Sequence, residues 1–309
     1  MKIVVKIRGG LGNQLFQYAY AKKMLVEYPE AKIYLDVSYY NKKHIRNLEI
    51  LNYNLDSRIG IIRHENKIVS LLYLIYRLIN KFYLKIFNRE FRQPSILMSL
   101  GLWFSGKTFK YKKVRIWLNR IYLCGYFQDI SEIRGVIDGI QQEISIYKSK
   151  KTDLYKEEIL KDINNLGVSI RCGNDYKKFG WPVCTREYYI SGVNYMIKKY
   201  GSKNIFIFAD DINKIIEENW FGVFSDRNIV YVNNLNVTEG LSVLMQCSNF
   251  VVSNSTFALW GVILNGHGYT VAPQYFYNNI EMRNSSIALD NVIYLDNYYG
   301  KEIATAIRD

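Results

Sequence analysis

The second half of the chain constrains the fold most strongly, because short apolar segments alternate there with helical patterns. Segments that are apolar throughout and separated by helices form parallel sheets that are covered on both faces. The sequence therefore predicts an α/β fold with a parallel sheet. The predicted strands are Val168–Ile170, Ile205–Ala209, Ile229–Val232, Phe250–Val252 and Thr270–Ala272, and the predicted helices are Tyr188–Tyr200, Asn213–Asn219, Thr238–Cys247 and Thr256–Leu264.

The first half begins in the same way, with a strand, a glycine-rich turn and a helix. The predicted elements are the strand Ile3–Ile7, the turn with Gly9, Gly10 and Gly12, the helix Asn13–Glu27 and the strand Ile33–Leu35. A length of 309 residues suits two domains. We place their boundary in the charged stretch around residue 150, which gives domains 1–152 and 153–309. Two Rossmann-like domains with a cleft between them are expected, and a C-terminal helix over about 301–308 that crosses back to the first domain.

Positive charge is concentrated in one segment of the chain. The net charge is +13, and residues 61–125 hold 13 Lys and Arg residues against only Glu65 and Glu90. Within residues 68–88, which are mostly apolar, Arg77, Lys81 and Lys85 recur at every fourth position. This spacing predicts an amphipathic helix with a basic stripe. Its longest uncharged run has nine residues, fewer than the about 20 needed to span a bilayer.

Two interpretations of this basic, amphipathic insertion are open. The helix either lies on the anionic inner face of a membrane, where lipid-linked glycans are found, or packs into the first domain with a solvated basic edge. Binding of nucleic acid is a further class of function that the charge alone suggests. We do not expect it, because the sequence lacks the signatures of the common nucleic-acid-binding modules.

The cysteines and the N-terminus indicate the compartment. The four cysteines are scattered, with neither a C-x-x-C pair nor a Cys/His cluster, which is typical of a reducing environment and predicts no zinc site. The apolar segment at the N-terminus is too short for a signal peptide. We therefore expect a cytoplasmic protein, peripheral on the inner face of the membrane if the amphipathic helix binds there.

Polar residues follow three of the predicted strands of the second half. They are Arg171 after the first strand, Asp210 and Asp211 after the second, and Ser253, Asn254, Ser255 and Thr256 after the fourth. Ligands of open parallel sheets collect at the carboxyl ends of the strands, where helix N-termini converge. Arg171 suits a phosphate. The other two groups either cap the helices that follow them or contact a ligand, and the sequence leaves both alternatives open.

In the first half, Gly10 and Gly12 let the backbone approach a ligand closely, and Asn13 and Gln14 carry donors suited to sugar hydroxyls or a diphosphate. The alternative is a tight turn with no ligand. The glycine spacing differs from the G-x-G-x-x-G pattern of dinucleotide-binding proteins.

Several segments resemble the motifs of the α-1,2-fucosyltransferases, glycosyltransferase family 11. The segment GGLGNQLFQYA at 9–19 resembles the family's N-terminal motif, FIFADD at 206–211 its second motif, and SNSTFALW at 253–260 its third, which includes Phe257. Its His-x-Arg-Arg-Gly-Asp motif is similar to residues 169–175. Arg171 stands at the first Arg, Ser169 and Cys172 replace the His and the second Arg, and Asn174 is inserted before Asp175.

The resemblance implies a GT-B fold and an inverting galactoside α-1,2-fucosyltransferase of polysaccharide biosynthesis. It would transfer L-fucose from GDP-β-L-fucose to a hydroxyl of a glycan or lipid-linked oligosaccharide, without a metal or other cofactor. The second domain would bind the donor and the first the acceptor. Arg171 would neutralise the departing diphosphate, and Asp175 is the candidate general base. A GT-B transferase of another nucleotide sugar is the alternative that the altered arginine motif leaves open.

Overall fold

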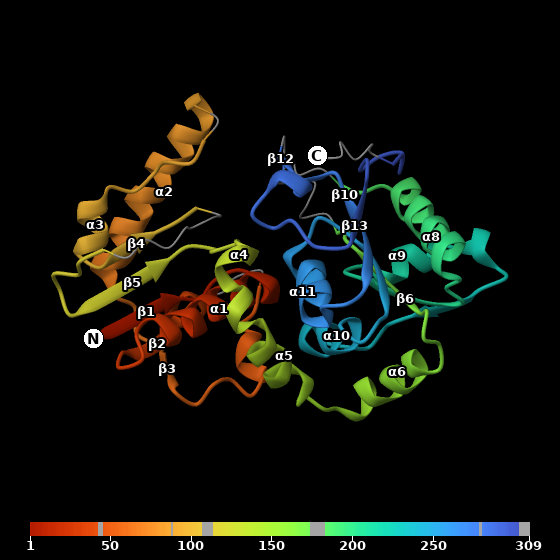
Figure 1. The fold of residues 1–309 in the computed structure, drawn as a ribbon, viewed down its shortest axis with the longest axis horizontal. Coiled ribbons are helices and arrows are strands. Elements are labelled where there is room, and N and C mark those ends of the chain that lie inside the picture. Colours follow the sequence, from red (N-terminus) through yellow and green to blue (C-terminus); the bar gives the residue numbers. More distant parts are fainter. Residues whose placement is uncertain (43–45, 88, 107–113, 174–182, 278–279, 303–309) are drawn as a thin grey trace. The chain divides into compact units, whose positions relative to one another are not determined.

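The computed structural model describes residues 1–42, 46–87, 89–106, 114–173, 183–277 and 280–302. The chain divides into two compact units, Met1–Glu143 and Ile144–Asp309. Each unit contains one parallel sheet with helices packed against it (Figure 1). The predicted fold class, α/β with two Rossmann-like units, is confirmed.

The sheet of the first unit has the strand order β3-β2-β1-β5-β4, and every pairing in it is parallel. Its central strands are apolar and buried, and helix α1 packs on β1 and β2. The strands are β1 (Lys2–Lys6), β2 (Lys32–Asp36), β3 (Ile59–Ile62), β4 (Leu102–Phe104) and β5 (Arg120–Cys124), and the helices are α1 (Leu11–Glu27), α2 (Lys67–Phe87), α3 (Ser95–Ser99), α4 (Ile130–Ile133) and α5 (Ile137–Ser145).

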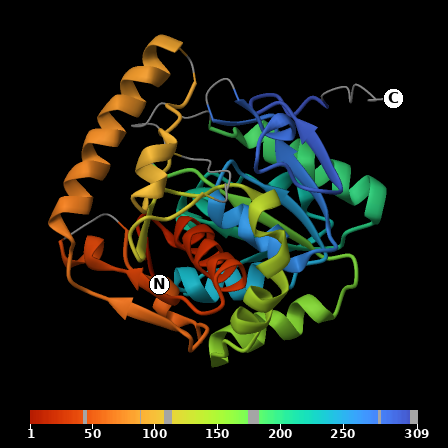
Figure 2. The ribbon, with the colours of Figure 1, turned by 60° about the vertical axis from the view of Figure 1, so that its left-hand side comes forward.

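Residues 61–125 are an integral part of this unit and not an insertion added to it. They supply β4 and β5, and β5 pairs directly with β1 at the centre of the sheet. Both strands are short, and β5 begins with Arg120, so neither was predicted as a strand from the sequence. The predicted amphipathic helix is present as α2, which Figures 1 and 2 show running beyond the strands of its unit.

The sheet of the second unit has the order β13-β10-β9-β6-β7-β8, again with parallel pairings only. Every strand predicted there is present, and β13 adds one that was not predicted. The strands are β6 (Leu166–Ile170), β7 (Asn204–Ala209), β8 (Asn228–Tyr231), β9 (Asn249–Val252), β10 (Tyr269–Pro273) and β13 (Val292–Leu295), and the helices are α6 (Lys150–Leu160), α8 (Arg186–Tyr200), α9 (Ile212–Glu217), α10 (Val237–Leu244) and α11 (Thr256–Asn265).

The division between the units falls after Glu143, earlier than the predicted boundary after residue 152. Helix α6 explains the difference, because it packs on α10 and so belongs to the second unit. Ser149, which caps α6, also donates a hydrogen bond to Glu239 on α10 at 2.9 Å. The predicted C-terminal helix lies mostly outside the described residues. A small antiparallel pair, β11 (Tyr275–Tyr277) with β12 (Ile280–Glu281), follows β10.

Candidate active site

The polar residues predicted to share one edge of the second sheet do lie on adjacent strands. Strand β6 has β7 on one side and β9 on the other, and all three run parallel. Arg171, Asp210 and Ser253 each follow the carboxyl end of one of them. The backbone N–H of Ser253 donates to the carbonyl of Ser169 at 3.0 Å, which holds the ends of β9 and β6 together. The fold thus gathers these residues at a single sheet edge.

Asp210 organises the loop that follows β6. One carboxylate oxygen of Asp210 pairs with Nη1 of Arg171 at 2.7 Å and accepts from the N–H of Gly173 at 3.0 Å. The other accepts from the N–H of Cys172 at 2.8 Å. The carboxylate therefore positions both the Arg171 guanidinium and the backbone beside it. For Asp210 the sequence left two alternatives open, a helix cap and a ligand contact.

Arg171 lies in a largely buried setting. Its side chain is 13% exposed and that of Asp210 is 20% exposed, so solvent screens their ion pair only in part. The hydroxyl of Tyr189, a fully buried residue of α8, accepts from the backbone N–H of Arg171 at 3.3 Å. Burial, with the Asp210 carboxylate nearby, raises the pKa of the Cys172 thiol to about 12. That thiol is therefore neutral at physiological pH and does not compete with the Asp210 carboxylate for the Arg171 guanidinium.

Asp211 caps a helix, which is one of the two alternatives that the sequence left open. It stands at the N-cap of α9, and its carboxylate accepts from the N–H of Lys214 at 3.2 Å. Aspartate is one of the preferred residues at this position because its oxygen satisfies an N–H group that has no partner in the helix.

The segment Ser253–Phe257 leads into α11. Ser255 occupies the N-cap, but its side chain makes no capping hydrogen bond among the described residues. The first N–H groups of a helix lack intrahelical partners and favour an anion. Ser253 is fully buried, and its hydroxyl has no hydrogen-bond partner in the described part of the chain. Among the described residues, Ser255 thus does not cap α11 through its side chain.

The other members of this segment differ in their surroundings. Asn254 is buried and donates from its side-chain amide to the carbonyl of Phe276 at 3.3 Å, which ties the segment to β11. Thr256 and Phe257 form the first turn of α11 and are partly exposed. Asp175, the candidate base, lies outside the described residues, as does Asn174.

In the first unit, the glycine turn connects β1 to α1. Gly9 has a φ of +85°, a left-handed conformation that glycine adopts without strain, and Gly10 is the N-cap of α1. Gly12 is buried within the first turn of the helix, and Asn13 beside it is half-buried and accepts from the side-chain amide of Gln128 at 2.7 Å. The backbone of the turn thus stands at the carboxyl edge of the first sheet.

Gln14 has a structural role, in contrast to the predicted ligand contact. Its amide nitrogen donates to the carbonyls of Gly9 at 2.9 Å and Asn47 at 2.7 Å. Its amide oxygen accepts from the N–H groups of Glu49 and Ile50, each at 2.9 Å. The side chain is fully buried, and these bonds occupy its donors and acceptor. Gln14 therefore joins the glycine turn to the loop over 47–50.

Sequence analysis missed a buried arginine at the same edge. Arg8 stands two residues after the end of β1 and is 9% exposed. Its guanidinium lies 5.3–5.5 Å from the ring centres of Tyr39, Tyr73 and Tyr126. Its position after a predicted strand was a usable signal, but the three tyrosines come from distant parts of the sequence. Facing aromatic rings stabilise a guanidinium through cation–π interactions.

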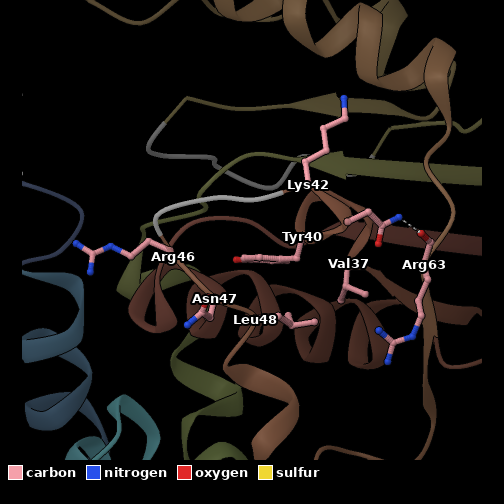
Figure 3. Close-up of a pocket in the computed structure, with 8 residues that line it drawn as sticks. Val37, Tyr40, Lys42, Arg46, Asn47, Leu48 and Arg63 are labelled. Atoms are coloured by element: carbon pink, nitrogen blue, oxygen red, sulfur yellow. Dashed lines mark hydrogen bonds between the residues drawn. The ribbon is translucent and has the colours of Figure 1, made fainter.

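An open pocket of about 330 Å³ lies near this edge in the first unit. It includes no acidic residue among those described, and its basic side chains extend in different directions around Tyr40, whose hydroxyl donates to the Gly9 carbonyl at 2.6 Å (Figure 3). The pocket therefore offers a positive rim and polar side chains suited to hydroxyl groups. Its lining consists of Val37, Tyr40, Asn41, Lys42, Arg46, Asn47, Leu48 and Arg63.

The chain has the architecture of a GT-B transferase, with two Rossmann-like α/β units. One of these units presents an arginine and a helix N-terminus at the carboxyl edge of its sheet. The sequence profile of glycosyl transferase family 11 matches residues 2–296, and the chain therefore belongs to this family of glycosyltransferases. The resemblance predicted from the sequence motifs is confirmed.

Two relatives from Escherichia coli match most of the chain. The O-antigen biosynthesis glycosyltransferase WbnK is 26% identical over 280 residues, which cover 84% of this chain and 89% of the relative. An alpha-1,2-colitosyltransferase is 25% identical over 295 residues, which cover 91% of this chain and 94% of the relative.

Similar solved structures include the family 9 glycosyl transferase from Veillonella parvula DSM 2008, with a TM-score of 0.49 and 11% identity over 96% of this chain and 86% of that chain. Another is the NodZ alpha-1,6-fucosyltransferase soaked with GDP-fucose, with a TM-score of 0.47 and 13% identity over 85% of this chain and 92% of that chain.

Proposed function

We propose that this glycosyltransferase transfers L-fucose from GDP-β-L-fucose to O2 of a galactoside in a glycan acceptor, with inversion and without a metal. Membership in glycosyl transferase family 11 supports the reaction class. The observation that carries the donor site is the ion pair of Arg171 with Asp210, next to the strand end that leads into α11. A guanidinium held in place there suits a diphosphate.

The residues of this edge would act on the leaving group. The bond from fucose to the diphosphate breaks through an oxocarbenium-like transition state, in which negative charge accumulates on the diphosphate. Fixed donors that face this charge stabilise the transition state more than the ground state. Arg171 supplies a positive charge, and the first N–H groups of α11 and the Ser253 hydroxyl supply dipoles. The acceptor hydroxyl attacks the opposite face of the sugar, which inverts the anomeric centre.

The acceptor is assigned to the first unit. The pocket beside Tyr40 supports this assignment, because its carboxamides and basic rim suit a polyhydroxylated ligand that also carries negative charge. A lipid-linked oligosaccharide has both features. We retain Asp175 as the proposed general base, which would accept the proton of the attacking hydroxyl.

Colitose is a second possible donor sugar and should be compared directly with fucose, because one relative is named an alpha-1,2-colitosyltransferase. The two donors are distinguished by incubating the protein with GDP-fucose or GDP-colitose and an array of β-galactosides, followed by mass spectrometry of the products. We expect a fucosylated product with an α-1,2 linkage. Transfer of colitose alone would replace the donor assignment, and transfer only from UDP- or ADP-sugars would refute the proposal.

A further inference from the structure

Helix α2 has three distinct faces. Val69, Tyr73, Tyr76 and Asn80 form the buried face. Tyr73 and Tyr76 pack on Phe104 of β4, with ring centres 5.4 and 5.7 Å apart. Asn80 accepts from the N–H of Phe91 at 2.7 Å. These contacts fix α2 on its own unit through one side and leave the rest of its circumference exposed.

The second face is apolar and exposed to solvent. Its residues recur every three or four positions along the whole helix, so they form one continuous row. Soluble monomers rarely expose an apolar row of this length, and such patches mark protein or membrane binding sites. The row contains Ile68 (73% exposed), Leu71 (58%), Ile75 (46%), Leu78 (61%), Phe82 (60%) and Ile86 (54%).

The third face is basic and borders the apolar row. Arg77, Lys81 and Lys85 are exposed and follow one another at intervals of one helical turn. At 100° per residue, they lie between the apolar row and the buried face. Helix α2 contains no acidic residue. A second copy of the chain therefore offers no acidic partner on α2 for this basic face, whereas anionic lipid headgroups match it.

We propose that α2 is a membrane-binding surface that lies in the plane of an anionic bilayer. The apolar row would enter the boundary of the acyl chains, and Arg77, Lys81 and Lys85 would remain at the level of the lipid phosphates. This is the arrangement of interfacial amphipathic helices. Across the described residues, no helix is long and apolar enough to cross a membrane.

The buried face of α2 connects this surface to the edge of the first sheet. The ring centre of Tyr73 lies 5.5 Å from the Arg8 guanidinium, and Lys6 donates to the hydroxyl of Ser70 at 2.6 Å. A bilayer that binds α2 would therefore hold the predicted acceptor unit at the surface where lipid-linked glycans reside. The inference itself rests on α2 and not on the identity of the donor sugar.

The test is flotation of the purified full chain with two kinds of vesicle, phosphatidylcholine alone and phosphatidylcholine with phosphatidylglycerol. We expect the chain to float with the anionic vesicles at low salt. The triple variant Arg77→Gln, Lys81→Gln, Lys85→Gln should bind them roughly 100-fold more weakly, since each basic residue contributes about 1 kcal/mol. The matched control removes the same charge elsewhere, by Lys150→Gln, Lys161→Gln and Lys203→Gln, and should bind as the unmodified chain does.

A second variant, Leu78→Glu with Phe82→Glu, interrupts the apolar row and should abolish flotation, while Leu160→Glu, at another exposed leucine, should not. Circular dichroism establishes that each variant is folded. The proposal is overturned if the unmodified chain fails to float at low salt, or if the variants and their controls float equally. It is also overturned if Leu78→Glu with Phe82→Glu converts a dimer to a monomer without changing flotation, because the apolar row would then be covered by a second copy.

Discussion

Replacing Asp210 with asparagine removes a charge while keeping the size of the side chain. The new carboxamide would keep one acceptor for the N–H of Cys172, but its amide nitrogen would face Nη1 of Arg171 and the N–H of Gly173, which are now 2.7 and 3.0 Å from a carboxylate oxygen. Hydrogen bonds to charged groups contribute about 1.5–3 kcal/mol. Because both side chains are only partly exposed, we expect the free energy of unfolding to fall by about 2 kcal/mol.

The same substitution should lower the rate of transfer. A guanidinium displaced by about 1 Å from its productive position can cost roughly 100-fold in rate. Loss of the negative charge also makes the site more positive, which favours binding of the diphosphate. We therefore expect kcat to fall roughly 10- to 100-fold and the donor KM to change little, as measured by release of GDP over a range of donor concentrations.

Asp211→Asn is the matched control, because asparagine caps a helix about as well as aspartate does. We expect this variant to retain the stability and kcat of the unmodified chain. Equal effects of the two substitutions, or a wild-type kcat for Asp210→Asn, would refute the positioning role of Asp210.

Three further substitutions test other parts of the structure. Gln14→Leu removes the partner of the Asn47 carbonyl and of the N–H groups of Glu49 and Ile50, whereas the Gly9 carbonyl keeps the Tyr40 hydroxyl. The free energy of unfolding in urea should therefore fall by about 2–4 kcal/mol, and a loss below about 0.5 kcal/mol would contradict the role of Gln14. Ser253→Ala removes a buried hydroxyl that has no partner within the described residues. Thermal stability should therefore stay the same or rise, while the donor KM should increase several-fold. An unchanged KM would show that Ser253 does not belong to the donor site. Hydrogen bonds from Arg58 hold the pKa of the Asp56 carboxyl well below its usual range. Ionised Asp56 therefore stabilises the fold above about pH 4. This stabilisation is lost as the pH falls from that value toward the lower pKa of the folded state. Asp56→Asn should therefore cost about 1 kcal/mol at pH 7 and progressively less below about pH 4, and a cost independent of pH would contradict this account.

The second sheet could be predicted from the sequence because its strands are continuous apolar segments. Phe250–Val252 was predicted, and β9 spans Asn249–Val252. In the first sheet, β5 was missed because Arg120 begins it and the strand lies within the most basic part of the chain. Sequence alone gave no reason to separate this strand from the charged segment around it.

The candidate site was predictable to the level of the sheet edge and no further. The rule that parallel strands end at one edge placed Arg171 and Asp210 together, but their ion pair depends on β6 and β7 being neighbours, which the sequence does not state. Gln14 looked suited to a ligand because its partners at 47–50 are distant along the chain. Arg8 was overlooked for the same reason, since its tyrosines converge only in the folded unit.

We propose that Arg171 binds the diphosphate of a GDP-sugar at the carboxyl edge of the second sheet. The test is titration calorimetry of GDP into the unmodified chain and into Arg171→Ala, with Arg63→Ala, at a basic residue of the first unit, as the control. Removal of a charge-assisted phosphate contact costs about 1.5–3 kcal/mol, so we predict that GDP binds Arg171→Ala roughly 10- to 150-fold more weakly and binds Arg63→Ala normally. Equal affinity of GDP for the unmodified chain and for a folded Arg171→Ala would contradict this role of Arg171.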